Sequence, residues 1–170
     1  MQKLVIVING NGGSGKDTIC NIVSKHFPTL VVSAISPVKE IAIKCGWNGE
    51  KDPKARKFLA DLKRLLVEYN DLPTRYLLEQ HEIFLNDEQY EFMFVHIREA
   101  DQIDDFLNKI DGRKITLLVR RDNLPVYNNF ADDNVESYNY DYVYENNGSL
   151  EKIEDDFMPF FQKMINEKKP

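Results

Sequence analysis

Short apolar runs alternate along this chain with longer segments in which apolar residues recur every three or four positions. The short runs are rich in β-branched and aromatic residues, which predicts strands at 3–9, 30–34, 92–97, 114–120 and 142–145. The longer segments have the periodicity of amphipathic helices. Regular alternation of strand and helix predicts an α/β fold, in which helices cover both faces of a parallel sheet.

Each predicted helix has an apolar stripe at helical spacing. The last helix is expected to begin after Gly148, with Ser149 as its N-cap. Pro159 should kink or restart that helix, because proline removes a backbone hydrogen bond. The stripes consist of Ile19, Ile22, Val23, His26 and Phe27; Phe58, Leu59, Leu62, Leu65, Leu66 and Tyr69; Leu77, His81, Phe84 and Leu85; Ile103, Phe106, Leu107 and Ile110; and Leu150, Ile153, Phe157, Phe160, Phe161 and Met164.

Two stretches are too polar and too rich in turn residues for regular elements. Residues 46–53 predict a turn-rich connection, and residues 122–140 combine Pro125 with paired Asn, paired Asp and several tyrosines. Long loops inside a compact domain are usually functional lids or disordered segments. We favour a lid over about 121–140, because it adjoins Arg120 and Arg121.

A glycine-rich segment directly follows the first predicted strand. Residues Gly10–Thr18 read Gly-Asn-Gly-Gly-Ser-Gly-Lys-Asp-Thr, a variant Walker A loop with Asp17 where Ser or Thr usually stands. Glycines let backbone N–H groups surround a polyphosphate, the Lys16 ammonium reaches its outer phosphates, and the next helix presents its positive dipole end. We therefore predict that a nucleotide is bound by Gly10, Asn11, Gly12, Gly13, Ser14, Gly15, Lys16, Asp17 and Thr18.

Two other nucleotide-binding motifs fit less well. Gly10-x-Gly12-x-x-Gly15 matches the dinucleotide fingerprint, but residues 31–35 supply no acidic side chain for a ribose. Asn108-Lys109-Ile110-Asp111 matches the guanine-reading tetrad of GTPases, yet it ends a predicted helix, whereas that tetrad belongs after a strand. A GTPase switch is the weakest reading, because no Asp-x-x-Gly switch segment accompanies the loop.

Composition narrows the choice of partners. The chain of 170 residues suits one domain, and its net charge of −6, with no basic stripe between aromatic residues, argues against binding a nucleic acid polymer. The N-terminal apolar run is too short for a signal peptide or a membrane span, so no membrane partner is expected. Cys20 and Cys45 fall on predicted helices with no pairing pattern, which favours the reducing cytoplasm.

The glycine-rich loop also resembles a known family. Gly10–Thr18 resembles the loop of small-molecule kinases of the adenylate kinase type, and its Gly-Lys-Asp core resembles phage-type deoxynucleoside monophosphate kinases and animal phosphomevalonate kinase. The order of shorter motifs downstream is also similar. These motifs are Ser36-Pro37-Val38-Lys39-Glu40, Arg56-Lys57-Phe58-Leu59, Val95-His96-Ile97-Arg98-Glu99-Ala100 and the stretch 141–150.

The resemblance implies a fold and an activity. The fold would be an α/β P-loop NTPase three-layer sandwich of the nucleoside monophosphate kinase type, with a five-stranded parallel sheet. One domain, 1–170, would carry an acceptor-binding helical insertion over about 36–88. The activity would be ATP- and Mg²⁺-dependent phosphoryl transfer to a small phosphorylated acceptor, first of all a (deoxy)nucleoside monophosphate. Phosphomevalonate or dephospho-coenzyme A kinase, and a non-catalytic nucleotide-binding module, remain alternatives, and a monomer or homodimer is expected.

The resemblance also assigns residues around the loop. It places Ser36, Lys39 and Arg56 on the acceptor side, and the loop formed by Asn146, Asn147 and Gly148 beside the adenine. From the residues alone, that loop is simply the turn that enters the last helix. Lys39 can equally be a helix-surface lysine.

Cationic side chains should carry the chemistry, because phosphoryl transfer depends on positioning and on neutralising the moving charge. With Lys16, we expect Arg98, Arg120 and Arg121 to be catalytic, since a guanidinium binds phosphate oxygens through two parallel bonds. Arg98 and Arg120 lie at strand ends, where open α/β sheets bind their ligands. Each arginine alone can also be an ordinary surface residue.

The expected metal ligands are Asp17 and Thr18. Asp17 can bind Mg²⁺ or polarise its water, or it can simply be a carboxylate favoured by the helix dipole. Where the family strand ends in an aspartate able to serve Mg²⁺, this chain has His96. A neutral imidazole is a poor ligand for that hard ion, so His96 puts magnesium-dependent catalysis in question. A core histidine with one hydrogen bond is the simpler reading of this residue.

Overall fold

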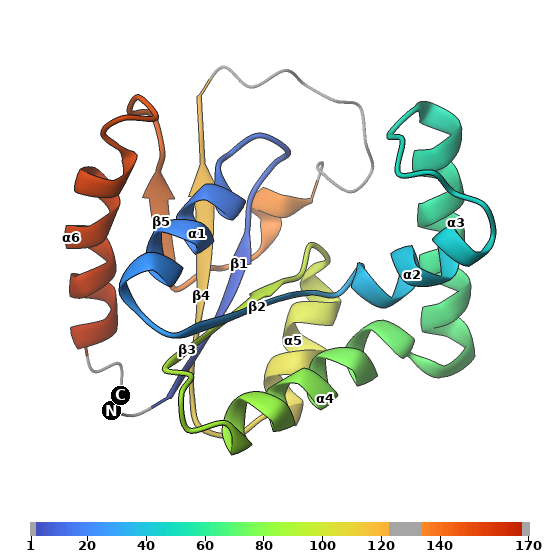
Figure 1. Ribbon diagram of the computed structural model, residues 1–170, viewed down its shortest axis with the longest axis horizontal. Coiled ribbons are helices and arrows are strands. Elements are labelled where there is room, and N and C mark those ends of the chain that lie inside the picture. The colour runs from blue at the N-terminus through green and yellow to red at the C-terminus, as the bar shows by residue number, and fades with distance from the viewer. Residues whose placement is uncertain (1–2, 123–133, 168–170) are drawn as a thin grey trace.

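The computed structural model describes residues 3–122 and 134–167, which form a parallel sheet with helices on both faces (Figure 1). The five strands lie in the order β2-β3-β1-β4-β5, and every pair is parallel. They are β1 (Leu4–Asn9), β2 (Thr29–Ser33), β3 (Phe92–His96), β4 (Arg113–Arg120) and β5 (Tyr142–Glu145). The predicted α/β fold and all five strands are confirmed, with bounds that differ by one residue at most.

The helices follow the strands in the alternation expected from the sequence. They are α1 (Lys16–His26), α2 (Ser36–Lys44), α3 (Pro53–Asn70), α4 (Leu72–Asn86), α5 (Ala100–Lys109) and α6 (Ile153–Asn166), and a short 3₁₀ turn, η1, spans Val135–Ser137. None of these described helices combines the length and the apolar character needed to cross a membrane.

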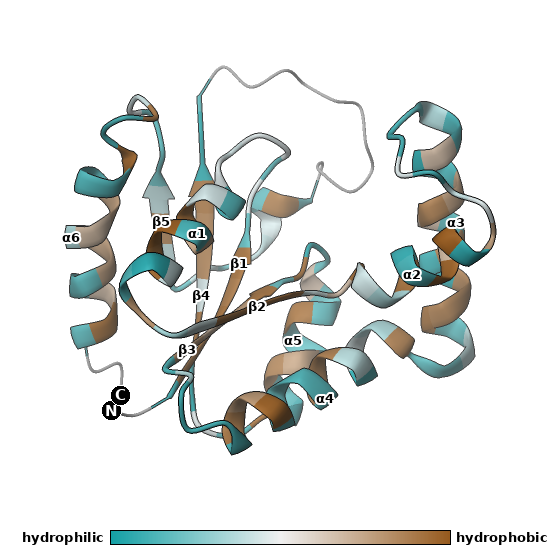
Figure 2. Cartoon of the chain, viewed as in Figure 1, coloured by the Kyte–Doolittle hydropathy of each residue, from teal (hydrophilic) through white to brown (hydrophobic). Residues whose placement is uncertain are grey.

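The central strand β1 is buried along its whole length, because both of its faces are covered. Leu4, Ile6 and Ile8 face one core, which includes residues of α1 and α6. Val5 and Val7 face the other, which includes residues of α4 and α5. Figure 2 shows the brown, hydrophobic residues gathered on these central strands. A continuous apolar run is what a parallel strand between two helical layers requires.

Helices α2 and α3 project from the sheet beyond the carboxyl end of β2 (Figure 1). The apolar stripe of α3 is at most half-buried, and no residue of this helix is fully buried. Leu65 is 54% exposed and Tyr69 is 85% exposed, so periodicity alone gave no measure of the burial of this face. The stripes of α1, α4 and α5 do supply core residues, although Leu85 of α4 is 48% exposed.

The start of the last helix was predicted wrongly. Helix α6 begins at Ile153 rather than after Gly148, and its preceding residue is Lys152, so Ser149 is not its N-cap. The Ser149 carbonyl instead accepts hydrogen bonds from the N–H groups of Lys152 and Ile153, which closes a turn before the helix. Leu150 therefore lies outside the helix and is 72% exposed.

The proline of this helix also behaves differently from the prediction of a restart. Helix α6 continues through Pro159 to Asn166. Phe157, Phe161 and Met164 on either side of the proline are buried in the same core. Packing of these side chains against the sheet outweighs the loss of one backbone hydrogen bond.

Candidate nucleotide-binding site

The carboxyl ends of the strands bring the predicted site residues to one edge of the sheet. The glycine-rich loop, residues 10–15, joins β1 to α1. His96 ends β3 beside it, since His96 pairs with Ile8 of β1. Arg120 ends β4 on the other side of β1. Ligands of open parallel sheets bind at this edge.

Glycine is required at two points of the loop. Gly10 has φ +148°, and a Cβ there would overlap the backbone oxygen of Val119. Gly15 precedes α1 with φ +98°, and a Cβ there would overlap the Nδ2 atom of Asn146. The loop can therefore lie against β4 and against the turn after β5 only because these side chains are missing.

Lys16 lies within the curve of the loop. Its Nζ atom donates to the carbonyl oxygens of Gly10, at 2.5 Å, and Asn11, at 2.9 Å. The ammonium is thus held beside the backbone of the loop, where the motif requires it, and the α1 dipole points its positive end to the same place. Asp17 and Thr18 follow in the first turn of α1, and the Asp17 side chain is 94% exposed.

Asn9 was missed by the sequence prediction, although its side chain fixes the entry to the loop. Asn9 is 1% exposed, and its Oδ1 atom accepts the N–H of Gly10 at 2.9 Å. Its Nδ2 atom donates to the Arg98 carbonyl at 3.0 Å and to the Tyr140 hydroxyl at 2.8 Å. One amide therefore joins the loop, the segment after β3 and the segment before β5. A polar residue closing an apolar strand before glycine was the available signal.

Asn146 supports the loop from the other side. It is 1% exposed, and its Nδ2 atom donates to the carbonyl oxygen of Ser14 at 2.8 Å. Its backbone N–H donates to the Arg120 carbonyl at 2.7 Å. Asn147 joins the turn after β5 to the end of β4, because its amide exchanges two hydrogen bonds with Asp122, at 2.8 and 2.9 Å. The predicted adenine-side loop thus also braces the phosphate-binding loop.

Arg120 lies at the strand end where it was expected, but two carboxylates hold it. Its Nε atom donates to both oxygens of Glu136, at 3.0 and 2.8 Å, and Nη1 donates to Glu145 at 3.4 Å. The hydrogen bonds to Glu136 raise the pKa of Arg120 above its ordinary value. A phosphate bound by Arg120 would therefore have to share the guanidinium with Glu136 or displace that carboxylate.

A small cavity of about 130 Å³ lies beside this ion pair. It is lined by Asn11, Val119, Arg120, Arg121, Asp122 and Glu136. The Oδ1 atom of Asn11 is buried and has no hydrogen-bond partner among the described residues. The loop and the two arginines thus line one cavity, and the catalytic role expected for Arg121 stays a prediction. Of the expected lid, only 121–122 and 134–140 are described, and 123–133 lie outside the described residues.

His96 faces the start of α1. Its Nε2 atom lies 3.5 Å from the Cys20 sulfur and 3.9 Å from an Asp17 carboxylate oxygen. Burial lowers the pKa of His96 below its ordinary 6.5, although the charge of Asp17 opposes this shift. Burial also raises the pKa of the Cys20 thiol, so a neutral imidazole stands beside a protonated thiol.

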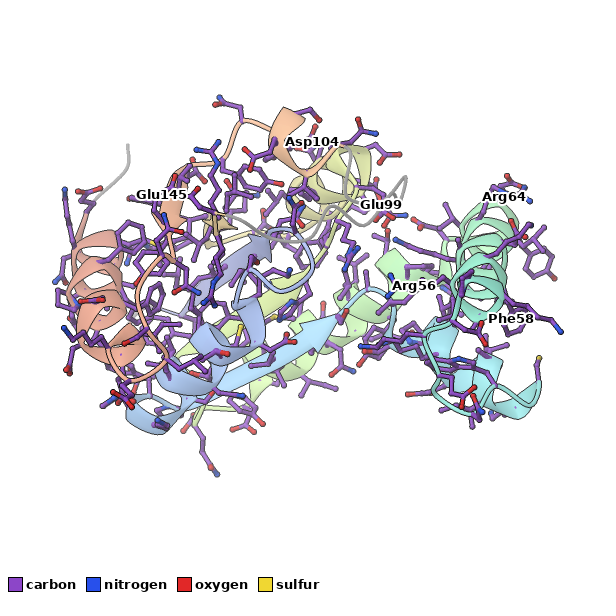
Figure 3. All side chains as sticks on the ribbon, turned by 90° about the horizontal axis from the view of Figure 1, so that it is seen from above. Arg56, Phe58, Arg64, Glu99, Asp104 and Glu145 are labelled. Carbon is purple, nitrogen blue, oxygen red and sulfur yellow. The ribbon has the colours of Figure 1, made fainter. Side chains whose placement is uncertain are left out.

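The residues expected on the acceptor side lie on the projecting helices. Ser36 and Lys39 are half-buried on α2, and Arg56, on α3, donates through Nε to the Lys51 carbonyl at 2.7 Å. Figure 3 shows Arg56 on the side of α3 that faces the sheet, and Phe58 and Arg64 on its outer side. Ser36, Lys39 and Arg56 keep their predicted role as a hypothesis.

One ion pair joins the projecting helices to the site. Lys63 of α3 is 14% exposed in its side chain, and its Nζ atom lies 2.6 Å from the Glu99 carboxylate. Glu99 immediately precedes α5 and follows Arg98. No local pattern could have predicted this pair, because the two residues are 36 positions apart.

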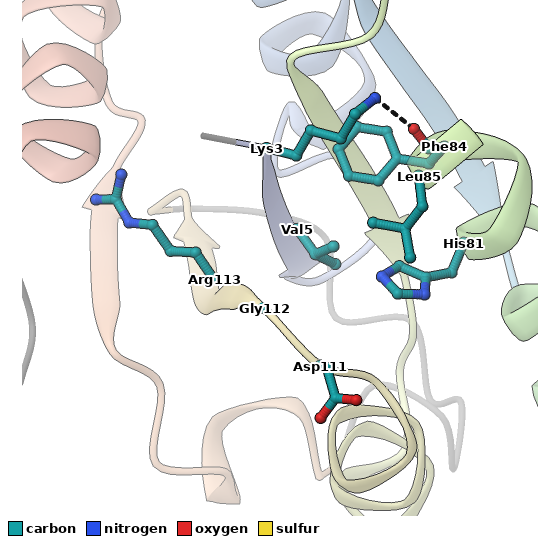
Figure 4. Close-up of a pocket in the computed structure, with 8 residues that line it drawn as sticks. All are labelled: Lys3, Val5, His81, Phe84, Leu85, Asp111, Gly112 and Arg113. Atoms are coloured by element: carbon teal, nitrogen blue, oxygen red, sulfur yellow. Dashed lines mark hydrogen bonds between the residues drawn. The ribbon is translucent and has the colours of Figure 1, made fainter. Parts of the chain in front are cut away.

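A larger cavity, of about 300 Å³, lies at the opposite edge of the sheet (Figure 4). Its two cations are already bound to the ends of helices: Lys3 donates to the carbonyls of Phe84, at 2.5 Å, and Asp87, at 2.6 Å, and Arg113 donates to carbonyls at the end of α6. His81 is 5% exposed there. We interpret this cavity as a seam between helix and sheet, remote from the phosphate-binding loop.

The chain was compared with known protein families, sequences and structures, and only the structures match. No protein-family model and no curated protein sequence matches the chain. A dephospho-CoA kinase from Campylobacter jejuni superposes with a TM-score of 0.56 at 16% identity, over 96% of this chain and 98% of that chain. TT1252 from Thermus thermophilus gives 0.51 at 20% identity, over 96% and 99% of the chains. A thymidylate kinase from Candida albicans gives 0.51 at 11% identity, over 98% and 94%.

The chain has the P-loop NTPase fold. This confirms the predicted fold class, with the glycine-rich loop, residues 10–15, as the P-loop between β1 and α1. Identities of 11–20% establish a shared fold and leave the activity to be argued from the site. The finer resemblance, to phage-type deoxynucleoside monophosphate kinases, stays a prediction.

Proposed function

We propose that this P-loop protein is an ATP-dependent kinase that phosphorylates a small phosphorylated acceptor, with a (deoxy)nucleoside monophosphate as the first candidate. The observation that carries the proposal is the position of Lys16, whose ammonium lies in the curve of the loop, 2.5 and 2.9 Å from two loop carbonyls. The similarity to the solved structures of a dephospho-CoA kinase and a thymidylate kinase supports it.

The reaction would break the bond between the γ-phosphorus of ATP and its bridging oxygen and form a bond from that phosphorus to an acceptor phosphate oxygen. ADP would leave with the electron pair of the broken bond. A monophosphate acceptor is already ionised near neutral pH, so it needs no base, whereas the ribose hydroxyl of dephospho-coenzyme A would have to lose its proton as the new bond forms. The protein would position both substrates and neutralise the charge of the transferred phosphoryl group. We assign both roles to Lys16, Arg98, Arg120 and Arg121.

The nucleotide of such kinases carries a divalent cation, and the oxygen atoms of Asp17 and Thr18 in the first turn of α1 suit Mg²⁺. When bound there, the ion would neutralise charge on the phosphates. The acceptor would lie toward α2 and α3, where Ser36, Lys39 and Arg56 are found. We expect the protein to act in the cytoplasm, as a monomer or a homodimer.

A second candidate acceptor is dephospho-coenzyme A. The similarity to the dephospho-CoA kinase from Campylobacter jejuni favours it, because that structure superposes with a TM-score of 0.56 over 98% of its chain. We expect side chains of α2 and α3 to form the pocket that would choose between the two acceptors.

A panel assay tests the function. The protein is mixed with ATP, one acceptor at a time and either Mg²⁺ or Mn²⁺, and ADP is measured. The acceptors are the eight common nucleoside and deoxynucleoside monophosphates, dephospho-coenzyme A and phosphomevalonate. ADP formed with one acceptor class and not without it supports the proposal. Nucleotide binding without ADP from any acceptor would instead indicate a regulatory nucleotide-binding module.

A lysine variant tests the assigned role of the loop. Lys16→Met removes a charge-assisted contact worth about 1.5–3 kcal/mol, so ATP affinity should fall on the order of 10- to 100-fold. Lys25→Met is the matched control, because Lys25 lies on the same helix and pairs with Glu154 at the surface, 2.8 Å away. Unchanged ATP affinity in Lys16→Met would refute the nucleotide site, and with it the kinase.

A further inference from the structure

His96 and Asp17 come from different elements and face each other at the start of α1. His96 ends β3, which lies next to β1 in the sheet, and Asp17 lies in the first turn after the P-loop. The Nε2 atom and the Asp17 Oδ1 atom are 3.9 Å apart. This exceeds the 2.7–3.2 Å of a direct hydrogen bond, so the two atoms are neighbours without being bonded.

The separation suits two ligands of one cation. First-row divalent ions hold imidazole nitrogen and carboxylate oxygen at about 2.0–2.2 Å, so two such donors on one ion are at most about 4.3 Å apart. The observed 3.9 Å lies inside that limit. The Asp17 side chain is 94% exposed and can adjust without disturbing any packing, whereas His96, at 16% exposed, is held in place.

The groups around His96 indicate that an ion would bind only together with a nucleotide. The Cys20 sulfur, 3.5 Å from the same Nε2 atom, makes only a weak hydrogen bond that a metal ion can displace. The positive charges of Lys16 and Arg98 also act on His96 and oppose a bare cation. Within residues 3–122 and 134–167, no three His, Cys, Asp or Glu side chains gather as a metal site. The phosphates of a nucleotide would have to supply the remaining ligands and the negative charge.

We propose that His96 and Asp17 together ligate the cation that accompanies the nucleotide, and that the site therefore takes Mn²⁺ or Co²⁺ in preference to Mg²⁺. Mg²⁺ selects oxygen ligands, whereas divalent first-row ions also accept imidazole nitrogen, with an affinity that rises from Mn²⁺ to Co²⁺. This inference rests on the proposed nucleotide-dependent function and concerns the same site. His96 thereby becomes a metal ligand at the strand end where the resemblance predicts an aspartate.

Pulsed electron paramagnetic resonance of the full chain with Mn²⁺ and a non-hydrolysable ATP analogue tests the ligand directly. A coordinated imidazole couples its nitrogen to Mn²⁺, and labelling the protein with ¹⁵N-histidine should replace the ¹⁴N signal with a ¹⁵N signal. His26 lies at the far end of α1 and His81 at the opposite edge of the sheet, so a histidine signal assigns His96. Absence of the ¹⁵N signal while the Mn²⁺–nucleotide complex is bound would overturn the proposal, with no variant needed.

Titration calorimetry measures the preference. In the unaltered protein, the Mn²⁺ complex of the analogue should bind more tightly than the Mg²⁺ complex. His96→Asp should lower the affinity ratio, Mn²⁺ complex over Mg²⁺ complex, at least tenfold. The control His26→Gln should leave the ratio unchanged. An equal ratio in His96→Asp and the unaltered protein would contradict the inference while nucleotide binding, and hence the proposed function, stands. Failure of every metal–nucleotide complex to bind would instead remove the proposed function itself.

Discussion

Replacing Gly15 by alanine should destabilise the protein by about 2–4 kcal/mol, even without any ligand. Gly15 has φ +98°, a conformation that costs a residue with a side chain about 1–2 kcal/mol. The new Cβ would also overlap Asn146 Nδ2, which donates to the Ser14 carbonyl at 2.8 Å. Losing that buried hydrogen bond adds about 1–2 kcal/mol.

Gly12→Ala is the matched control. Gly12 belongs to the same loop, yet a Cβ there would meet no atom within 4 Å. Its stability should therefore change by less than about 0.5 kcal/mol. Urea denaturation followed by circular dichroism measures both variants, and in a chain of this size the Gly15→Ala midpoint of thermal unfolding should fall by roughly 5–15 °C.

A double variant tests the cause of the loss. Removing the obstructing amide in Asn146→Ala relieves the overlap, so Gly15→Ala should cost less in that background than in the unaltered protein. If Gly15→Ala were as stable as Gly12→Ala, or if its cost were the same in both backgrounds, the contact between the loop and the turn after β5 would not exist as described.

Three further outcomes are expected. Glu136→Gln should raise the affinity for a nucleotide by up to about fivefold in titration calorimetry. The half-exposed ion pair between Arg120 and Glu136, worth about 0.2–1 kcal/mol, would no longer compete with the phosphate for Arg120. A lower affinity would mean that Glu136 instead positions Arg120 for the phosphate. Burial lowers the pKa of His81 below 6.5, so the stability that the neutral imidazole contributes is present above pH 6.5 and is lost as the pH falls. In His81→Leu, the free energy of unfolding should therefore decline less steeply between about pH 7 and 5 than in the unaltered protein. An equally steep decline in both proteins would refute this. Asn9→Ala should cost about 1–3 kcal/mol in urea denaturation, since it leaves the buried Gly10 N–H without its acceptor, and a loss under about 0.5 kcal/mol would contradict that role.

Local signals in the sequence were sufficient for the sheet and the P-loop. The run Leu4–Ile8 is apolar at every position because β1 is covered on both faces, and a glycine-rich segment that leads into Lys16 directly after such a strand is typical of a phosphate-binding loop. Each of these features depends on neighbouring residues, which is why the sequence alone could predict them.

Features that depend on distant residues were not predictable. The amphipathic pattern of α3 shows which residues share a face, but Tyr69, 85% exposed, shows that it cannot say how much lies against that face. Ser149 had the right chemistry for an N-cap, yet its backbone carbonyl closes a turn instead. The pairing of Arg120 with Glu136 joins residues 16 positions apart across a polar segment and has no sequence signature.

The strand order also bears on how the protein emerges from the ribosome. Within the described residues 3–90, β1 and β2 have no partner strand, since both pair with β3, which begins at Phe92, and β1 pairs in addition with β4. The apolar strand β1 therefore cannot pair with a neighbouring strand until more than half of the chain has been translated. A nascent chain of this protein should accordingly bind chaperones before residue 92 leaves the exit tunnel, and become resistant to proteases only when β4 has followed.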